Sequence, residues 1–199
     1  MARLRQGLWV DDSRFDQIFP EWARGLSTVH WTPVAVAVRA AELLVRSPGT
    51  RVLDVGAGVG KFCLVGSLVT EGTFYGIEAC SLFVHAARAT AERLQMRGTR
   101  FLHGNMMALD WGRFDAFYLY NPFADNLESL LESQDSPLGV DPRLFDAYVR
   151  FAREQLQAAR VGTRVATYHG LGGAMPPSYR LEYEGERELE WLEVWTKAY

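Results

Sequence analysis

The sequence has little cysteine, no long apolar run and no strong excess of charge of either sign. Its 199 residues include only two cysteines, Cys63 and Cys80, which excludes a disulfide framework and a four-cysteine zinc site. We expect both to be buried thiols in a reducing compartment. No stretch approaches the roughly 20 apolar residues of a membrane span, and no apolar signal segment precedes Asp11 and Asp12. We therefore expect a cytoplasmic protein without membrane contact.

The formal net charge is -3, so a dominant electrostatic attraction to nucleic acid phosphates is not expected, although a local basic patch is compatible with this value. The four histidines are scattered without a close pair, and we predict no metal site. Hydrophobic residues make up 48% and charged residues 23%, as in ordinary globular proteins, and the length suits one domain with a full core. We predict an N-terminal arm or lid over 1–30, packed on a single domain over 31–199.

Strand and helix patterns alternate along the chain, which predicts a parallel sheet covered on both faces. Strand patterns occupy 51–55, 73–78, 100–103, 114–120 and 163–168, and helix patterns occupy 33–45, 63–69, 82–96 and 141–157. Thr32 is the expected N-cap of the first of these helices. Two final strands, over 179–183 and 189–196, are joined by a tight turn at 184–186 with no helix between them, which predicts a hairpin at the sheet edge.

A glycine-rich turn, Gly56-Ala57-Gly58-Val59-Gly60, follows the first predicted strand. A tight turn needs residues that tolerate unusual dihedral angles and that place no Cβ in the path of a ligand. In an open α/β sheet, ligands bind outside the carboxyl ends of the strands, where this turn lies. A glycine cluster alone also fits a purely structural turn, so both interpretations stay open at this point.

Polar residues follow the next two strands. Glu78 ends the second strand, eighteen residues past Gly60, and a carboxylate there can accept both hydroxyls of a ribose. Asn105 follows the third strand after Gly104, and its amide can read an adenine edge while Met106 packs on the base. Each residue alone fits an ordinary strand end or turn, but together with the glycine turn they indicate a nucleoside-containing ligand.

The spacing differs from that of a dinucleotide site, because the third glycine comes one residue early for G-x-G-x-x-G. Asp54 lies two residues before the first glycine. Its carboxylate would repel a pyrophosphate and suits a ligand that carries an ammonium or sulfonium charge.

The run 52–60 resembles the first motif of the class I, seven-strand S-adenosylmethionine-dependent methyltransferases. The runs 75–78, 103–105 and 120–123 resemble their second, third and fourth motifs, and the terminal hairpin resembles their reversed last strand. The resemblance covers residues 30 to 199 and departs at Asn105, where many relatives have aspartate. It implies an α/β, Rossmann-like doubly wound, mostly parallel seven-stranded sheet with a C-terminal antiparallel hairpin and helices on both faces.

The same resemblance implies a methyltransferase that converts S-adenosyl-L-methionine to S-adenosyl-L-homocysteine. The residues expected to bind this cofactor are Asp54, Gly56, Ala57, Gly58, Gly60, Glu78, Ala79, Gly104, Asn105, Met106 and Asn121.

The methyl acceptor is expected beyond the fourth strand. Asn121 and Pro122 would place an amide and a carbonyl near the transferred methyl group, where they can hold a nitrogen by its hydrogens. We predict Asn121, Pro122 and Tyr120 as catalytic residues, and a nitrogen of a protein side chain or small molecule as the acceptor. In the competing interpretation Pro122 only ends the strand and Tyr118 and Tyr120 fill the core. His169, after the fifth strand, is either a general base or a loop residue.

Two further interpretations remain open: an NAD(P)-binding oxidoreductase, and a module that binds S-adenosylmethionine without catalysis. Arg88, Arg93, Arg97 and Arg100 are expected to form a solvated face rather than a phosphate groove. The sequence predicts no oligomeric state.

Overall fold

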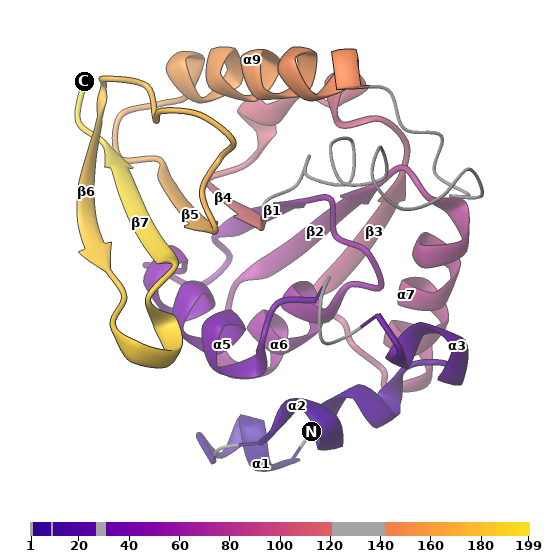
Figure 1. The fold of residues 1–199 in the computed structure, drawn as a ribbon. Coiled ribbons are helices and arrows are strands. Elements are labelled where there is room, and N and C mark those ends of the chain that lie inside the picture. Colours follow the sequence, from indigo (N-terminus) through magenta and orange to yellow (C-terminus); the bar gives the residue numbers. More distant parts are fainter. Residues whose placement is uncertain (1, 9, 27–30, 121–141) are drawn as a thin grey trace.

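One seven-stranded sheet forms the centre of the computed structural model, which describes residues 2–8, 10–26, 31–120 and 142–199 (Figure 1). The strands are β1 (Arg51–Val55), β2 (Thr73–Glu78), β3 (Thr99–His103), β4 (Ala116–Tyr120), β5 (Arg164–Tyr168), β6 (Tyr179–Glu184) and β7 (Leu192–Lys197). Their order across the sheet is β3-β2-β1-β4-β5-β7-β6. The first five pair in parallel, and β7 runs antiparallel to both β5 and β6. The predicted parallel sheet with a terminal hairpin is confirmed.

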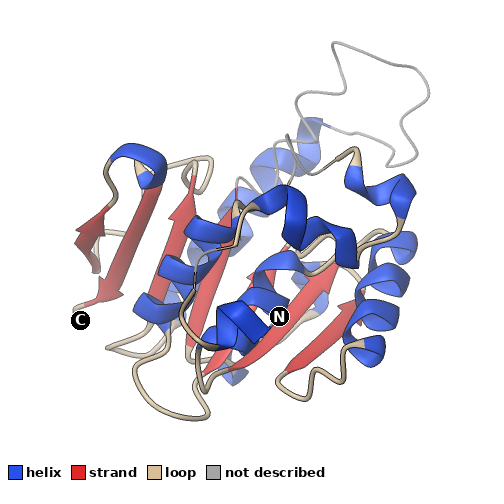
Figure 2. Ribbon diagram, turned by 90° about the horizontal axis from the view of Figure 1, so that it is seen from below, coloured by secondary structure: helices blue, strands red, loops and turns tan. Residues whose placement is uncertain are grey.

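Helices cover both faces of this sheet (Figures 1 and 2). The helices are α1 (Ala2–Arg5), α2 (Asp12–Phe15), α3 (Glu21–Arg24), α5 (Val34–Leu44), α6 (Lys61–Val69), α7 (Ser81–Arg93) and α9 (Pro142–Ala158). The 3-10 helices are η1 (Asp16–Ile18), η2 (Met106–Ala108), η3 (Trp111–Arg113) and η4 (Arg187–Leu189). The chain proceeds outward from β1 to β3 through α6 and α7 and then returns to the other side of β1, so right-handed crossovers place α9 on the opposite face. No helix in the described part of the chain is long and apolar enough to cross a membrane.

The two faces of β4 show how the core is divided. Successive side chains of a strand point to opposite faces of the sheet. The Tyr118 ring stacks on Phe62 of α6, with ring centroids 3.8 Å apart. The Phe117 ring stacks on Trp111 of η3 on the other face, at 5.0 Å. The sheet is therefore packed on both sides, as its nearly continuous apolar strands predict.

The predicted start of α5 is wrong in one detail. Pro33 rather than Thr32 occupies the N-cap position, and the Pro33 side chain forms no capping hydrogen bond. The Thr32 hydroxyl instead lies 2.9 Å from the Tyr118 hydroxyl. The carboxylate of Asp12 accepts the Val34 N–H at 2.9 Å, so a residue distant in sequence satisfies the first helical donor.

The terminal hairpin has a longer connection than the predicted tight turn. Residues 187–189 wind into η4, and the last strand begins at Leu192. Gly185 is required here because a Cβ at this position would lie 1.9 Å from the Leu189 carbonyl oxygen. The chain can therefore fold back on itself only where residue 185 has no side chain.

The N-terminal segment, residues 2–8 and 10–26, packs on the outer side of α6 and α7 (Figure 1). Phe15, Phe19 and Ala23 are buried in the same core cluster as α5 and α6. Trp22 stacks on Phe83 of α7, with ring planes 6° apart and centroids 6.0 Å apart. The aromatic residues of this segment thus anchor it beside α6, which follows the glycine turn, and beside α7.

Candidate functional site

The glycine loop, residues 56–60, joins β1 to α6 at the carboxyl end of the sheet. Gly58 and Gly60 have φ values of +53° and +82°, which side chains disfavour. No atom lies within 4 Å of the position that a Cβ of Gly58 would take, so the loop is open to a ligand there. At Gly60 the same position lies 2.4 Å from the Phe101 ring. The Gly58 position is thus open, whereas the missing side chain at Gly60 allows α6 to pack closely against β3.

Glu78, at the end of β2, lies directly beside this loop. Its Oε2 accepts the Gly58 N–H at 2.9 Å, and its Oε1 accepts the Cys80 N–H at 2.8 Å. The loop is also tied to β2 through the Gly56 and Ala57 N–H groups, which both donate to the Ile77 carbonyl oxygen. A half-buried carboxylate with lone pairs to spare therefore stands next to the open face of Gly58.

Asp54 lies beneath the loop, with 4% of its surface exposed. Cys63 Sγ donates a hydrogen bond to its Oδ2 at 3.4 Å. The pKa of Asp54 is raised to about 7, chiefly by burial; the Cys63 hydrogen bond lowers it, and the negative charge of Glu78 adds a smaller rise. The buried Asp54 side chain is therefore only partly ionised near neutral pH. Cys63 is buried as predicted, but Cys80 is only half-buried.

The Asn105 side chain is held on both of its polar atoms. Its Oδ1 accepts the Met107 N–H at 2.8 Å and so caps η2, while its Nδ2 donates to the Tyr148 hydroxyl at 3.0 Å. Met106 is only 7% exposed and belongs to the core beneath α9, so little of its surface is left to meet a base. A role of either residue in adenine binding stays a prediction.

The strand ends around Asn105 are nevertheless joined. Gly104 N–H donates to the Glu78 carbonyl oxygen at 3.0 Å, and His103 Nε2 lies 3.1 Å from the Ala79 carbonyl oxygen. The structure thus brings the first three predicted strand ends together at one edge.

An aromatic cluster occupies the carboxyl ends of β4 and β5. The Tyr120 ring lies 5.0 Å from that of Tyr168, and the His169 ring lies 4.3 Å from Tyr168 and 5.4 Å from Trp191. His169 has a φ of +59°, a strained conformation for a residue with a side chain. Partial burial lowers its pKa, against the effect of the Glu190 charge. This imidazole is therefore neutral at neutral pH and can accept a proton.

Two predicted catalytic residues, Asn121 and Pro122, lie outside the described residues. Trp191, by contrast, was not predicted. The antiparallel pairing of β7 with β5 brings Trp191 beside His169, whose N–H donates to the Trp191 carbonyl oxygen at 3.1 Å. The predicted hairpin was the feature of the sequence from which this neighbourhood could have been inferred.

A buried ion cluster behind the glycine loop was also missed by the sequence analysis. Lys61 Nζ lies 2.5 Å from Asp12 Oδ1 and 2.8 Å from Asp16 Oδ1. The cation also lies 5.8 Å from the centre of the Trp31 ring. The available signals were a lysine in the first turn of a helix, where the helix dipole disfavours a cation, and two aspartates one helical turn apart. The cluster ties the N-terminal segment to the residue after Gly60.

No group of histidine, cysteine, aspartate and glutamate side chains within the described ranges could hold a metal ion.

Comparison with known proteins gives structural neighbours only. No protein-family model matches the sequence, and no curated protein matches it. An RNA methyltransferase from Salinibacter ruber in complex with S-adenosyl-L-homocysteine has a TM-score of 0.61 and 19% identity, with 84% of this chain and 94% of that chain covered. TrmN from Thermus thermophilus has a TM-score of 0.57 and 22% identity over 83% of this chain. The match covers 49% of TrmN, so the chain spans about half of that protein.

A third neighbour is MtNAS in complex with S-adenosylmethionine, with a TM-score of 0.55 and 13% identity over 99% of this chain and 73% of that chain. All three neighbours match this chain at TM-scores of 0.55 to 0.61 and at identities of 13 to 22%, a likeness that lies in the fold. The chain therefore has the seven-stranded, Rossmann-like fold of the class I S-adenosylmethionine-dependent methyltransferases.

Proposed function

We propose that the protein is an S-adenosylmethionine-dependent methyltransferase that methylates a nitrogen of a protein side chain or small molecule. The bound cofactor would supply a methyl group activated by a cationic sulfonium. The observation that carries the proposal is the pairing of Glu78 Oε2 with the Gly58 N–H at 2.9 Å, beside a loop face that is open to a ligand.

The residues around this pairing fit the cofactor. Glu78 can accept hydrogen bonds from ribose hydroxyls, and Gly58 lets the backbone approach the ligand. Ionised Asp54 would add a negative field beneath the loop, which favours a cationic donor over a pyrophosphate, and a bound cation would in turn lower the raised pKa of Asp54. The reversed strand β7 and this charge both disfavour a nicotinamide dinucleotide.

The acceptor is proposed to lie against the aromatic cluster at the ends of β4 and β5. Tyr120 and Trp191 offer ring surface, and neutral His169 can take the proton that an amine loses as its nitrogen forms the new bond to carbon. Asn121 and Pro122, next in the chain after Tyr120, remain the proposed positioning groups for that nitrogen.

A nitrogen of an RNA base is the second candidate acceptor. The neighbour from Salinibacter ruber is an RNA methyltransferase, and a base can stack on the exposed ring of Trp191, which is 55% accessible.

The test begins with binding. Isothermal titration should show that S-adenosylmethionine and S-adenosylhomocysteine bind and that NAD does not. Glu78→Ala should weaken both by roughly tenfold or more, because hydrogen bonds to a charged group are lost. Glu184→Ala, which removes a carboxylate at another strand end, is the matched control and should have no effect.

Methyl transfer is then measured with a tritiated donor offered to three separated fractions of a cell extract: protein, small molecules and RNA. Label in the protein or small-molecule fraction supports the first acceptor class, and label in RNA alone supports the second. Donor binding without label in any fraction would reject catalysis in favour of a binding module.

A further inference from the structure

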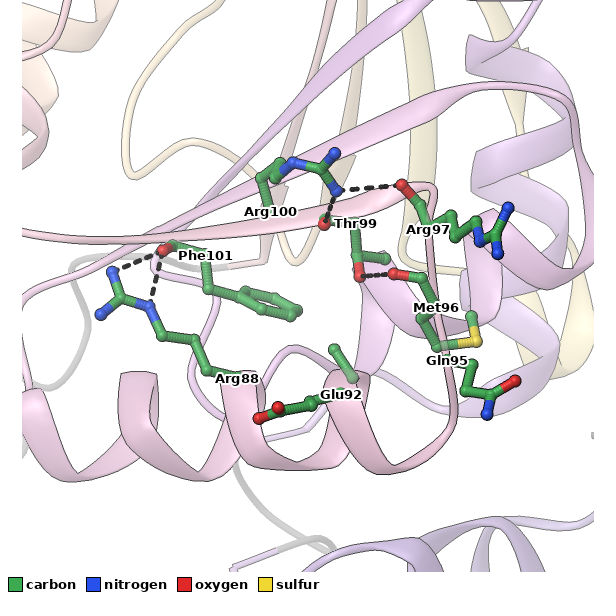
Figure 3. Close-up of a pocket in the computed structure, with 9 residues that line it drawn as sticks. Arg88, Glu92, Gln95, Met96, Arg97, Thr99, Arg100 and Phe101 are labelled. Atoms are coloured by element: carbon green, nitrogen blue, oxygen red, sulfur yellow. Dashed lines mark hydrogen bonds between the residues drawn. The ribbon is translucent and has the colours of Figure 1, made fainter.

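Two of the hollows in the protein surface differ in what they offer a ligand. The hollow between α7 and β3 has arginines on its rim, but Arg88 and Arg100 donate to backbone carbonyl oxygens and point away from each other (Figure 3). These guanidinium groups therefore provide no common binding point, in keeping with the predicted solvated face. A hollow of about 330 Å³ beside β5 and β7 has one carboxylate on its lining, that of Glu193, and neither lysine nor arginine among its lining residues.

This second hollow lies on the face of the sheet that α9 covers. Thr167 of β5 pairs with Glu193 of β7, and Trp195 lies two residues further along β7, so the three side chains point to the same face. Trp195 packs against the core beneath α9. The loop 170–177, between β5 and β6, forms the other wall. The Tyr168 ring points to the opposite face, toward the aromatic cluster, so the hollow is separate from the proposed methyl-transfer site.

The Glu193 carboxylate is held at one oxygen only. Its Oε2 accepts the Thr167 hydroxyl at 3.3 Å and the Trp195 Nε1–H at 3.2 Å. Among the described residues, Oε1 has no hydrogen-bond donor and Glu193 has no ion-pair partner, yet this oxygen is not closed off from solvent. A half-buried negative charge with a fixed orientation and one open oxygen therefore lines the hollow.

An uncompensated carboxylate attracts a cation, and the hydrogen bonds already present at Glu193 restrict which cation fits. A guanidinium binds a carboxylate best through both oxygens at once. Oε2 already accepts two hydrogen bonds, one for each of its lone pairs, so only Oε1 is left for a ligand. A primary ammonium is a compact charge that needs a single acceptor oxygen. The geometry therefore favours an ammonium over a guanidinium.

The surfaces around this oxygen suit a short hydrocarbon chain. Met175 and Trp195 are half-buried, so part of the thioether and part of the indole are open, and Ala174 and Pro177 are exposed. A volume of about 330 Å³ lies at the lower end of the range for small-molecule sites. The hollow can thus take an ammonium group together with the few methylene groups that carry it.

We propose that this hollow binds a primary alkylammonium group, either of a free aliphatic amine or of a lysine side chain. The ammonium donates to Glu193 Oε1, and its methylene groups lie against Met175 and Trp195. Gly170, which directly follows His169, also lines the hollow. A bound amine therefore lies against the loop that begins at the candidate general base.

The test is a titration of the full-length protein with 1-aminobutane, with its neutral analogue 1-butanol and with a lysine blocked at both backbone ends. The signals of the six tryptophan indole N–H groups in proton–nitrogen NMR spectra follow the binding, and Trp195→Phe identifies the signal of Trp195. Both amines should shift that signal, because the Trp195 N–H shares the Glu193 carboxylate with the ligand. 1-Butanol should not shift it, because it carries no charge.

Glu193→Gln tests the carboxylate itself. Glutamine keeps one oxygen that can accept from Thr167 and Trp195, and it replaces the open oxygen by an NH2 donor. The affinity for both amines should therefore fall by roughly tenfold or more, while the melting temperature stays close to that of the natural protein. Glu188→Gln removes a carboxylate from η4, outside the lining of the hollow, and as the matched control it should bind amines as the natural protein does.

The outcomes separate the two sources of the ammonium. Tighter binding of the blocked lysine identifies a protein side chain as the ligand, and tighter binding of 1-aminobutane identifies a free amine. Absence of a Trp195 shift with either amine, an equal shift with 1-butanol, or an unchanged affinity in Glu193→Gln would overturn the proposal. Gly58→Val should retain amine binding, so a failure of the proposed methyl-donor site would be seen separately.

Discussion

Replacement of Lys61 by methionine is expected to destabilise the protein strongly. The side chains of Lys61 and Asp16 are 3% and 6% exposed, and their charged atoms lie 2.8 Å apart. Methionine fills most of the volume of lysine but removes the positive charge 2.8 Å from the buried Asp16 carboxylate. Removal of one partner from a buried ion pair costs about 3–5 kcal/mol, because the remaining charge is no longer compensated.

This cost can be read as a change in melting temperature. In a protein of this size, 1 kcal/mol corresponds to a shift of about 2–4 °C, so the melting temperature of Lys61→Met should fall by about 6–20 °C. Asp12→Asn should cost less, on the order of 1 kcal/mol, because the Asp12 side chain is 44% exposed and water can replace part of the interaction. Circular dichroism during heating, together with urea titration, measures both values.

A double variant separates the charge effect from lost packing. Lys61→Met combined with Asp16→Asn removes both charges, so it should be more stable than the sum of the two single changes predicts. The coupling should amount to at least about 1 kcal/mol. Additive effects within about 0.5 kcal/mol, or a cost below about 1 kcal/mol for Lys61→Met, would refute the view that charge compensation holds this cluster together.

Two other residues give predictions of different kinds. Gly58→Val should weaken binding of S-adenosylmethionine by tenfold or more in a titration, because it strains a φ of +53° and fills the open face of the loop. Gly162→Val introduces comparable strain at a φ of +85° in an exposed loop far along the chain, and it should leave that affinity unchanged. For Asp54, the pKa rises from 3.8 in the unfolded chain to about 7 in the folded protein, so the folded state holds a proton that the unfolded state has released. Stability should therefore fall as pH rises from about 4 through 7. In Asp54→Asn this part of the pH dependence should disappear from urea midpoints measured at pH 5 and 8, and an identical slope in both proteins would contradict the assigned burial.

The first two strands could be predicted well from the sequence because they are short, largely apolar runs bounded by turn residues, whereas the predicted starts of β4 and β7, at 114 and 189, lie two and three residues too early. Arg51–Val55 and Thr73–Glu78 were predicted with the bounds that the structure gives. The end of α7 was predicted wrongly: the sequence pattern extends to Met96, whereas the helix ends at Arg93. Gln95 takes a φ of +53° and Met96 turns into the core, and neither event leaves a pattern in the sequence.

The candidate site was predictable where it depends on strand order. The ends of adjacent parallel strands must meet, so Glu78 was expected beside the glycine loop, and its hydrogen bond to Gly58 confirms that they meet. The groups that join distant segments were not predictable. The Lys61 cluster spans 49 residues between Asp12 and Lys61, and the bonds from Arg88 to Phe101 exist only because α7 folds back on β3.

The Lys61 cluster also links stability to the proposed chemistry. Lys61 directly follows Gly60, and the Asp12 carboxylate that it contacts also accepts the Val34 N–H of α5. One carboxylate thus connects the start of α5, the first turn of α6 and the N-terminal segment. Displacement of the N-terminal segment must therefore alter the first turn of α6, which directly follows the glycine loop. Lys61→Met, studied well below its melting temperature, should therefore bind S-adenosylmethionine more weakly although Gly58 and Glu78 are intact, and an unchanged affinity would show that the loop is held by β2 alone.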